Sequence, residues 1–243
     1  ERVLRKTEEV PSGHDPELYA VERLFVTADD GAEVPVTVLR LKSTPVDGTA
    51  PLLLYGYGSY GATMPAWFST NILSLVDRGV VYAVAHIRGS SARGRQWYLD
   101  GKLDKKKNSF SDFANAAEEL QERGYGRKGE TVIYGGSAGG LLVGATLNLR
   151  PDLFGGAIAA VPFVDVINTI SDAELPLTPP EWVEWGDPIN DPQAYATIAA
   201  YSPYENVRDD IDYPPVLATG GLTDYRVTYW EPARGTGSQT RGA

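Results

Sequence analysis

The stretch "TVIYGGSAGGLL", residues 131–142, constrains the fold of this chain more than any other part of its sequence. A run of strand-forming residues passes through glycines into an apolar helical segment, which predicts a sharp turn around Ser137. Gly135 and Gly139 flank this serine in the pattern GxSxG. Such glycines let the strand and helix approach closely while the serine hydroxyl projects. We expect a nucleophile elbow, with the amide of Ala138 at the helix N-terminus facing a developing oxyanion. GxSxG by itself also occurs in ordinary glycine-rich turns, so its surroundings matter.

Strand and helix patterns alternate around the elbow. Residues 21–41 hold two runs rich in Val, Leu and Thr, joined by a turn at 29–31, which predicts an antiparallel hairpin. The alternation further along predicts a mostly parallel sheet with helices on both faces. Near-continuous apolar runs, typical of covered strands, lie at 51–58, 80–87, 131–136, 156–161 and 214–221.

The clearest helix pattern covers residues 108–125. Ser109 is the predicted N-cap, with Asp112 three residues later, and Gly124 is the predicted stop. We interpret the basic run before it, residues 105–107, as a solvated loop. One apolar face of the helix predicted at 108–125 is formed by Phe110, Phe113, Ala117 and Leu120.

Length and charge limit the classes of function. With 243 residues and 42% hydrophobic content, the chain can form one sizeable domain. A net charge of -10 argues against nucleic acid as a partner, because no excess of basic groups is available for phosphates. The sequence contains no cysteine, which fits a reducing compartment, and no run of about 20 apolar residues. The charged start does not resemble a signal peptide, so we expect a cytoplasmic protein without a membrane segment.

A nucleophilic serine on such a fold needs an acid and then a histidine later in the chain. "PPVLATGGLTDYRV" supplies a strand, a glycine turn and Asp224, which is our candidate acid, although it could be an ordinary loop aspartate. The chain has two histidines, His14 and His86, and both precede Ser137. His86 closes a predicted strand and is best interpreted as a hydrogen-bonded structural histidine.

A second glycine pattern needs a separate interpretation. Gly56, Gly58 and Gly61 satisfy GxGxxG after a strand, as in dinucleotide-binding turns. No helix can start at the third glycine because Pro65 follows closely, and Asp77 lies before the next strand instead of at its far end. We expect these glycines to let a loop pass close to a substrate, and we expect no cofactor.

Several stretches together resemble the catalytic domain of the prolyl oligopeptidase family of serine peptidases, in its oligopeptidase B (protease II) branch. The resemblance covers about residues 10–233 and implies an α/β-hydrolase fold. It implies Ser137 as nucleophile, Asp224 as triad acid, and an oxyanion hole formed by the Ala138 amide and the Tyr57 hydroxyl. The stretches that carry it are "LLLYGYGSYGA", "AHIRGSSARGRQWYLDGK", "KKKNSFSDFANAAEEL", "GGSAGGLLVGA", "AAVPFVDV", "PLTPPEWVEWGDP", "YSPYENV" and "GLTDYRVTYWEPA".

The same resemblance implies a substrate site for short peptides cleaved after Arg or Lys. Tyr60 would line the primary pocket, Arg226 would bind a substrate carbonyl, and Glu181 would recognise the basic side chain of the substrate. Val183 stands where the family has a second carboxylate, and Glu184 would point elsewhere on an extended segment.

Two further positions depart from the family. Pro65 and Trp67 stand where acidic residues that read the preceding substrate residue can occur. Together with the single acidic residue in the primary pocket, they predict relaxed or altered specificity.

The resemblance also suggests how the chain is organised. We expect a connecting segment at 1–20, a C-terminally incomplete catalytic domain at 21–234, and an unstructured tail at 235–243. The family's last strand, last helix and catalytic histidine have no counterpart here, so this chain is expected to be inactive or a fragment. An N-terminal β-propeller is expected in the full-length protein. The alternatives are an inactive relative that binds basic peptides and, less favoured, an esterase on the same fold.

Overall fold

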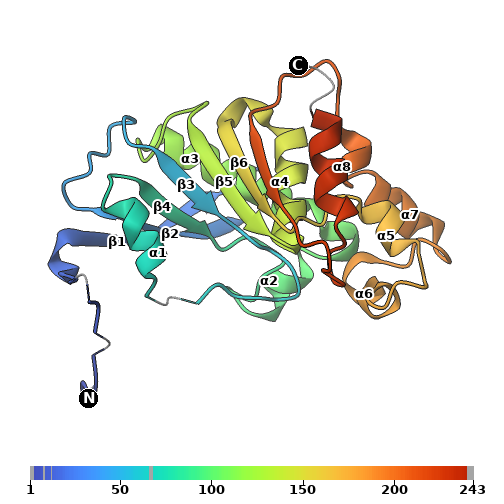
Figure 1. The fold of residues 1–243 in the computed structure, drawn as a ribbon, viewed down its shortest axis with the longest axis horizontal. Coiled ribbons are helices and arrows are strands. Elements are labelled where there is room, and N and C mark those ends of the chain that lie inside the picture. The colour runs from blue at the N-terminus through green and yellow to red at the C-terminus, as the bar shows by residue number, and fades with distance from the viewer. Residues whose placement is uncertain (1–2, 8, 12, 66–67, 240–243) are drawn as a thin grey trace.

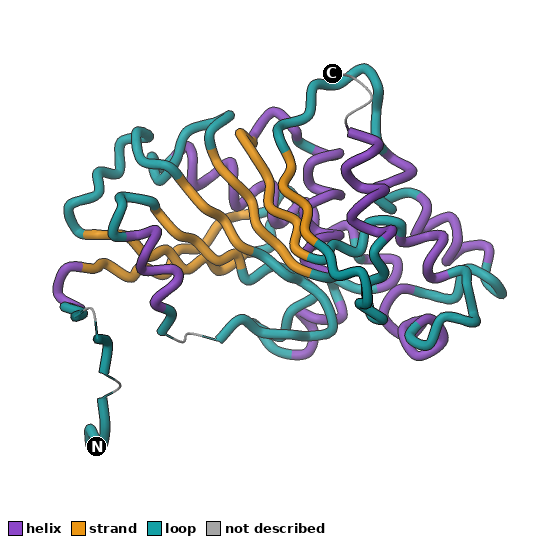
Figure 2. The backbone as a smooth tube through the Cα atoms, viewed as in Figure 1, coloured by secondary structure: helices purple, strands orange, loops and turns teal. Residues whose placement is uncertain are grey.

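The fold is built on one twisted sheet of seven strands, in the order β1-β2-β4-β3-β5-β6-β7 (Figures 1 and 2). β1 pairs antiparallel with β2, and β2 with β4, whereas all other pairs are parallel. The predicted N-terminal hairpin and mostly parallel sheet are therefore confirmed. The computed structural model describes residues 3–7, 9–11, 13–65 and 68–239. The strands are β1 (Tyr19–Thr27), β2 (Glu33–Leu41), β3 (Leu52–Tyr55), β4 (Val81–Ala85), β5 (Thr131–Gly136), β6 (Phe154–Ala160) and β7 (Val216–Thr219).

Helices follow most of the parallel strands. No helix in the described ranges is long and apolar enough to cross a membrane. Short 3-10 turns lie at Pro16–Leu18, Leu103–Lys105, Pro151–Leu153 and Tyr204–Asn206. The α-helices are α1 (Thr70–Val76), α2 (Arg95–Leu99), α3 (Lys107–Glu122), α4 (Ala138–Leu149), α5 (Val166–Ile170), α6 (Thr178–Trp185), α7 (Pro192–Ala199) and α8 (Trp230–Gln239).

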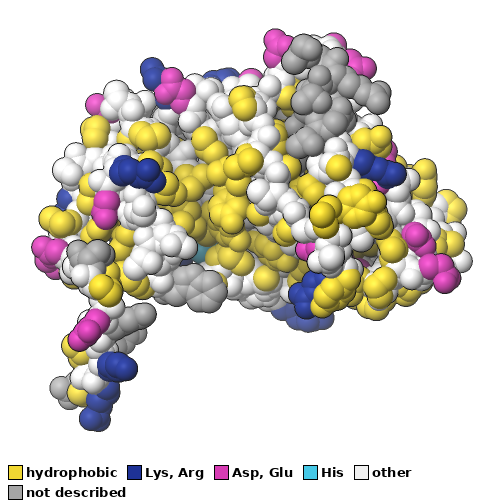
Figure 3. All heavy atoms as spheres, in the orientation of Figure 1, with side chains coloured by type: hydrophobic (Ala, Val, Ile, Leu, Met, Phe, Trp, Pro, Cys, Tyr) yellow, Lys and Arg dark blue, Asp and Glu magenta, His cyan; other side chains and the backbone are white. Residues whose placement is uncertain are grey.

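The two faces of the sheet differ in how far they are covered. Successive side chains of a strand point to opposite faces, so β3 presents Leu54 to one face and Tyr55 to the other. Leu54 is buried against the face where Phe113 of α3 and Leu142 of α4 pack close to Gly56. Tyr55, on the opposite face, is only half-buried. In Figure 1, α1 lies on this second face, and Figure 3 shows apolar side chains gathered there over the sheet. Helices therefore lie on both faces, as expected, although α1 covers only part of the second face (Figure 1).

Helix α3 confirms its predicted apolar face but not its predicted start. Phe110, Phe113, Ala117 and Leu120 are all buried. The helix begins at Lys107, so Ser109 lies in its first turn and is not the N-cap. The Ser109 hydroxyl instead donates to the carbonyl of Arg88 at 2.8 Å, because the loop after β4 passes directly over the helix start. Gly124, with φ +83°, follows the helix end as expected.

The basic run before α3 is not a uniformly solvated loop. Lys105 is half exposed and pairs with Asp100, but Lys106 is 1% exposed. The interpretation as a solvated loop was wrong for Lys106 because its side chain turns inward beneath the loop that follows β3.

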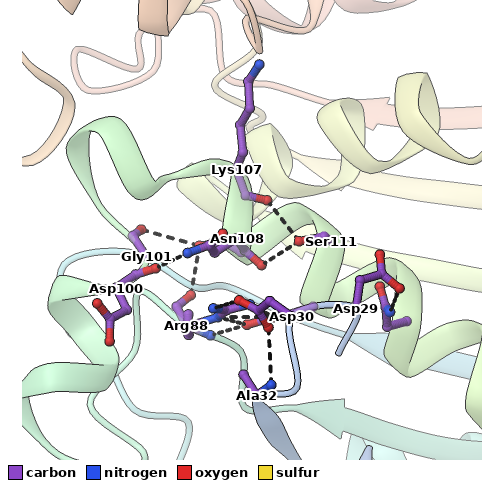
Figure 4. A network of polar contacts seen from close by, with 12 residues as sticks. Asp29, Asp30, Ala32, Arg88, Asp100, Gly101, Lys107, Asn108 and Ser111 are labelled. Carbon is purple, nitrogen blue, oxygen red and sulfur yellow. Dashed lines mark hydrogen bonds and ion pairs between the residues drawn. The ribbon is translucent and has the colours of Figure 1, made fainter. Parts of the chain in front are cut away.

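A buried ionic cluster fastens α3 to the sheet (Figure 4). The Arg88 guanidinium, just after β4, bonds Asp112 of α3 at 2.6 and 2.9 Å and Asp30 of the hairpin turn at 2.5 Å. Asp112 is fully buried and also accepts the backbone N–H of Arg88 at 2.9 Å. One arginine therefore joins the hairpin, the end of β4 and the first turns of α3.

The C-terminal part of the chain differs from the expected unstructured tail at 235–243. Helix α8 continues to Gln239, and residues 240–243 lie outside the described residues. The buried carboxylate of Glu231 accepts the backbone N–H groups of Val164 and Asp165 at 2.8 and 2.7 Å. Arg234 also pairs with Asp165. These contacts hold α8 beside β7. The amino-acid composition of residues 235–243 did not predict this helix.

Candidate active site

Ser137 occupies the sharp turn between β5 and α4. Its backbone lies in the left-handed region, with φ +55° and ψ -120°. Four backbone hydrogen bonds hold this conformation: Ser137 donates to Ala160 at 2.9 Å and accepts from Gly140 at 2.8 Å, Phe163 at 3.1 Å and Leu141 at 3.3 Å. A non-glycine residue held in this way stores about 1–3 kcal/mol of strain and is typical of functional sites.

The two glycines of GxSxG are required by close backbone contacts. A Cβ on Gly135 would lie 2.1 Å from the carbonyl oxygen of Gly139, and one on Gly139 would lie 2.9 Å from that of Gly56. The strand, the helix and the loop after β3 therefore meet at the serine. The sharp strand-to-helix turn expected at Ser137 is present in the structure.

Two residues expected to supply donors at the oxyanion position lie against this elbow. Ala138 is the first residue of α4, so its N–H has no partner within the helix. The Tyr57 ring lies 3.2 Å from the position of a Cβ on Gly139. Burial is the main cause that raises the pKa of the Tyr57 phenol, and the nearby Tyr55 and Glu181 raise it further. The phenol therefore stays a donor at neutral pH.

An aromatic and acidic cluster lies beside these donors. The Tyr60 hydroxyl donates to Oε2 of Glu181 at 2.8 Å, and the Trp185 indole donates to the same oxygen at 2.7 Å. The rings of Tyr60 and Trp185 meet edge to face at 5.6 Å. Within the described residues no hydrogen bond reaches Oε1 of Glu181, so one carboxylate oxygen remains free for a ligand.

Glu184 belongs to this cluster, which corrects the expectation that it points elsewhere. The segment is helical rather than extended, and residues three apart share one face of a helix. Glu184 is 2% exposed and accepts the backbone N–H of Tyr60 at 2.8 Å and the Tyr98 hydroxyl at 2.6 Å. Val183 is 72% exposed and turns away from the cluster.

Asp224 lies in the loop after β7, and its carboxylate accepts the backbone N–H groups of Arg226 at 2.8 Å and Val227 at 3.1 Å. The hydrogen bonds from Val227 and then Arg226 hold the pKa of Asp224 below its usual range. Parallel strands end at one edge of the sheet, so Asp224 and Ser137 share that edge, with β6 between their strands. No hydrogen bond joins Asp224 or the exposed Arg226 side chain to Ser137 among the described residues.

Neither histidine contacts Ser137. Nε2 of His86 lies 2.9 Å from the hydroxyl of Thr37 on β2, a strand that β4 and β3 separate from β5. Burial, followed by the charge of Arg23, lowers the pKa of His86 to about 4, so this ring is neutral at pH 7. The interpretation of His86 as a hydrogen-bonded residue at a strand end is confirmed. His14 packs its ring against Tyr19 and Phe68 near the start of the chain.

The loop after β3 lacks the geometry of a dinucleotide-binding turn. Helix α1 begins only at Thr70, well after Gly61. Pro65 is exposed, and Trp67 lies outside the described residues. Across the described ranges, no group of three His, Asp or Glu side chains is arranged to hold a metal ion.

The strand order and the serine elbow together define the α/β-hydrolase class. A sequence model described as the prolyl oligopeptidase family matches residues 66–237. The chain belongs to the prolyl oligopeptidase family.

Individual relatives agree with this assignment. Dipeptidyl aminopeptidase BI of Pseudoxanthomonas mexicana is 46% identical over 235 residues, covering 96% of this chain and 32% of the relative. Protease 2 of Moraxella lacunata is 44% identical over 225 residues, covering 93% and 32%. Among solved structures, oligopeptidase B from Leishmania major superimposes with a TM-score of 0.92 at 47% identity, covering 96% of this chain and 32% of that one. The chain therefore spans about a third of the length of the relatives it matches.

Proposed function

We propose that this chain forms the catalytic domain of an oligopeptidase-B-like serine peptidase that cleaves short peptides through an acyl-enzyme on Ser137. The observation that carries the proposal is the strained serine elbow, with the Tyr57 ring against it and the Ala138 N–H at the first position of α4, where it has no partner within the helix. The family membership and the names of the relatives support peptide hydrolysis as the reaction.

In the proposed mechanism, the Ser137 oxygen attacks a peptide carbonyl. The Ala138 N–H and the Tyr57 hydroxyl then donate to the oxyanion, a kind of interaction worth about 2.7–4 kcal/mol per donor. Asp224 would orient the histidine that takes the serine proton. Because neither His14 nor His86 contacts Ser137, the mechanism requires a base from outside these 243 residues.

The acidic cluster supports a preference for a basic substrate side chain. Glu181 offers one free oxygen, while its other oxygen is held by Tyr60 and Trp185. Glu184 adds a second negative charge nearby, although its own oxygens are already occupied. We propose that arginyl and lysyl peptides bind here with weaker discrimination than two free carboxylates would give. Competition of arginyl, lysyl and prolyl peptides for the site, compared between the native chain and Glu181→Gln, measures this preference; equal binding to both proteins contradicts it.

A fluorophosphonate probe tests the nucleophile, with imidazole supplied in solution as the base. We expect slow labelling of the native chain and faster labelling as imidazole is added. Ser137→Ala should abolish labelling, whereas Ser111→Ala, at an exposed serine of α3, should leave it unchanged. Labelling that persists in Ser137→Ala, or that never appears at any imidazole concentration, contradicts the proposal.

A second function, peptide binding without cleavage, is favoured by the lack of contact between Ser137 and either histidine. It predicts that an arginyl peptide binds in a Glu181-dependent manner while Ser137 stays unreactive towards the probe. Probe labelling therefore separates the two functions.

The greater length of the relatives supports a further domain in the whole protein, which we propose to be an N-terminal β-propeller. The mass of the protein isolated from its source tests this directly. A native mass equal to that of the 243-residue chain contradicts it.

A further inference from the structure

The loop that carries Tyr57 and Tyr60, residues 56–61, has an unusual backbone and is called the glycine loop here. Gly58, Tyr60 and Gly61 all have positive φ, of +76°, +59° and +67°. Tyr60 is not a glycine, so the left-handed conformation carries strain at that position. A Cβ on Gly58 would lie 2.6 Å from the Ile87 side chain. Contacts from outside the loop must therefore hold it in place.

The first of these contacts is a buried ammonium group. Nζ of Lys106 donates to the carbonyl of Gly58 at 2.6 Å and to the hydroxyl of Ser59 at 2.9 Å. The Gly101 carbonyl and the Ser109 hydroxyl each lie 3.3 Å away. No carboxylate oxygen of the described residues lies within 4.0 Å of this ammonium, so neutral acceptors satisfy its three N–H donors.

The second contact is a buried carboxylate next to Tyr60, the residue that follows Ser59. Glu184 accepts the Tyr60 N–H at 2.8 Å, and its other oxygen lies 3.8 Å from the Lys102 ammonium. A cation therefore binds the acceptors of the glycine loop, and an anion binds one of its donors. Among the described residues, no ion pair within 4.0 Å joins Lys106 to Glu184.

The Trp185 ring completes the arrangement. It lies 5.3 Å from the Lys106 ammonium and 5.6 Å from the Tyr60 ring. Burial lowers the pKa of Lys106 to about 7, and the charge of Glu184 opposes this shift. A buried ammonium is costly unless it makes specific contacts, and here the shortest contacts are with the glycine loop.

We propose that Lys106 and Glu184 are positioning residues that clamp the glycine loop, one through its acceptors and the other through a donor, and keep the Tyr57 hydroxyl at the serine elbow. This inference rests on the proposed function, because it assigns Tyr57 to the oxyanion. Tyr57 directly precedes Gly58, whose carbonyl Lys106 holds, so a shift of this carbonyl moves the tyrosine backbone as well.

Amide hydrogen exchange tests the clamp without any activity. Lys106→Met removes the ammonium, and Lys105→Met is the matched control at a neighbouring exposed lysine. We expect exchange in residues 56–61 to rise about tenfold in Lys106→Met, with β5 and α4 unchanged. Equal exchange in the two variants, or an equal rise across the whole sheet, overturns the inference.

A double-mutant cycle with Tyr57→Phe tests the link to the site. Under the imidazole conditions described above, Lys106→Met should slow Ser137 labelling about tenfold in the native background and less than about threefold in the Tyr57→Phe background. If Lys106 had only a structural role, Lys106→Met would slow Ser137 labelling equally in both backgrounds, and that result overturns the inference. If Ser137 never reacts, the proposed function fails while the exchange experiment still decides the clamp.

Two milder variants serve if Lys106→Met does not fold. Ser59→Ala removes one acceptor of the ammonium, and Glu184→Gln keeps an acceptor for the Tyr60 N–H but removes the charge. Each should raise exchange in residues 56–61 about threefold. Unchanged exchange in both variants overturns the inference.

Discussion

Arg88 and Lys106 are two buried cations in one corner of the molecule, but their surroundings are opposite. Arg88 is 6% exposed and is bonded to the carboxylates of Asp112 and Asp30, whereas Lys106 is 1% exposed and bonded only to carbonyl and hydroxyl oxygens. They also meet through Ser109, whose hydroxyl donates to the Arg88 carbonyl and lies 3.3 Å from the Lys106 ammonium. The arginine joins secondary-structure elements, and the lysine bonds the glycine loop.

The groups that bond each cation determine its pKa and therefore whether it stays charged as the pH changes. Burial alone would lower the pKa of Arg88, but the hydrogen bonds that it donates to Asp112 and Asp30 outweigh burial and raise the pKa. Burial lowers the pKa of Lys106 to about 7 because no carboxylate is close enough to compensate fully. Arg88 is thus charged at every physiological pH, whereas the charge of Lys106 depends on pH.

The largest effect should come from breaking the arginine cluster at its buried partner. Asp112→Ala leaves the Arg88 guanidinium with the half-exposed Asp30 alone, and we expect the free energy of unfolding to fall by about 3–5 kcal/mol. Urea unfolding measures this change. Glu118→Gln, at a carboxylate whose pair with Arg150 is solvent-exposed, is the control and should cost less than about 1 kcal/mol. Similar losses in the two variants contradict the assigned role of Asp112.

An effect that is smaller per pH unit distinguishes the lysine by its pH dependence. The folded pKa of Lys106, about 7, lies below its ordinary value of 10.5, so the unfolded chain binds more protons between these values. The contribution of Lys106 to the unfolding free energy should therefore rise with pH from about 7 to 10.5, by at most about 1.4 kcal/mol per pH unit.

The measurement is the difference in unfolding free energy between the native chain and Lys106→Met at several pH values. This difference should shift in favour of the native chain as pH rises. The corresponding difference for Lys105→Met should stay flat, and a flat result for Lys106→Met as well contradicts the buried, depressed state of this lysine.

The smallest effect sharpens the comparison within the arginine cluster. Asp30→Asn keeps an oxygen for the Ala32 N–H, but it removes the charge that faces Arg88 and replaces one oxygen that accepts from the guanidinium with an NH2 group. Because the Asp30 side chain is 50% exposed, we expect a loss of no more than about 1 kcal/mol in urea unfolding. A loss as large as that of Asp112→Ala would show that burial does not set the strength of these pairs.

Local patterns predicted most of the fold. The hairpin, the apolar strands and the apolar face of α3 depend on side-chain periodicity, which is visible within a few residues. The errors arose where distant segments decide the outcome. Ser109 was mistaken for a cap and Lys106 for a solvated residue because the loops that cover them come from elsewhere in the chain.

At the candidate site, too, a local pattern was predicted correctly and contacts between distant segments were missed. The pattern around Ser137 predicted the elbow, but Glu184 was missed because its segment was expected to be extended. Prolines at the start of α6 and Gly186 with φ +108° after its end are helix boundary signals that could have corrected this. No comparable signal in the sequence predicts the contact between Lys106 and the carbonyl of Gly58.

The sequence by itself determined the serine elbow, since only glycines at positions 135 and 139 leave room for the backbone to turn there. It also determined which strands are apolar enough to be covered. The tertiary structure alone decided where the charges of Lys106 and Glu184 lie, because both are buried against a loop far away in sequence. Burial and hydrogen-bond partners depend on segments that converge only in the folded chain, and they set the energy of a buried charge.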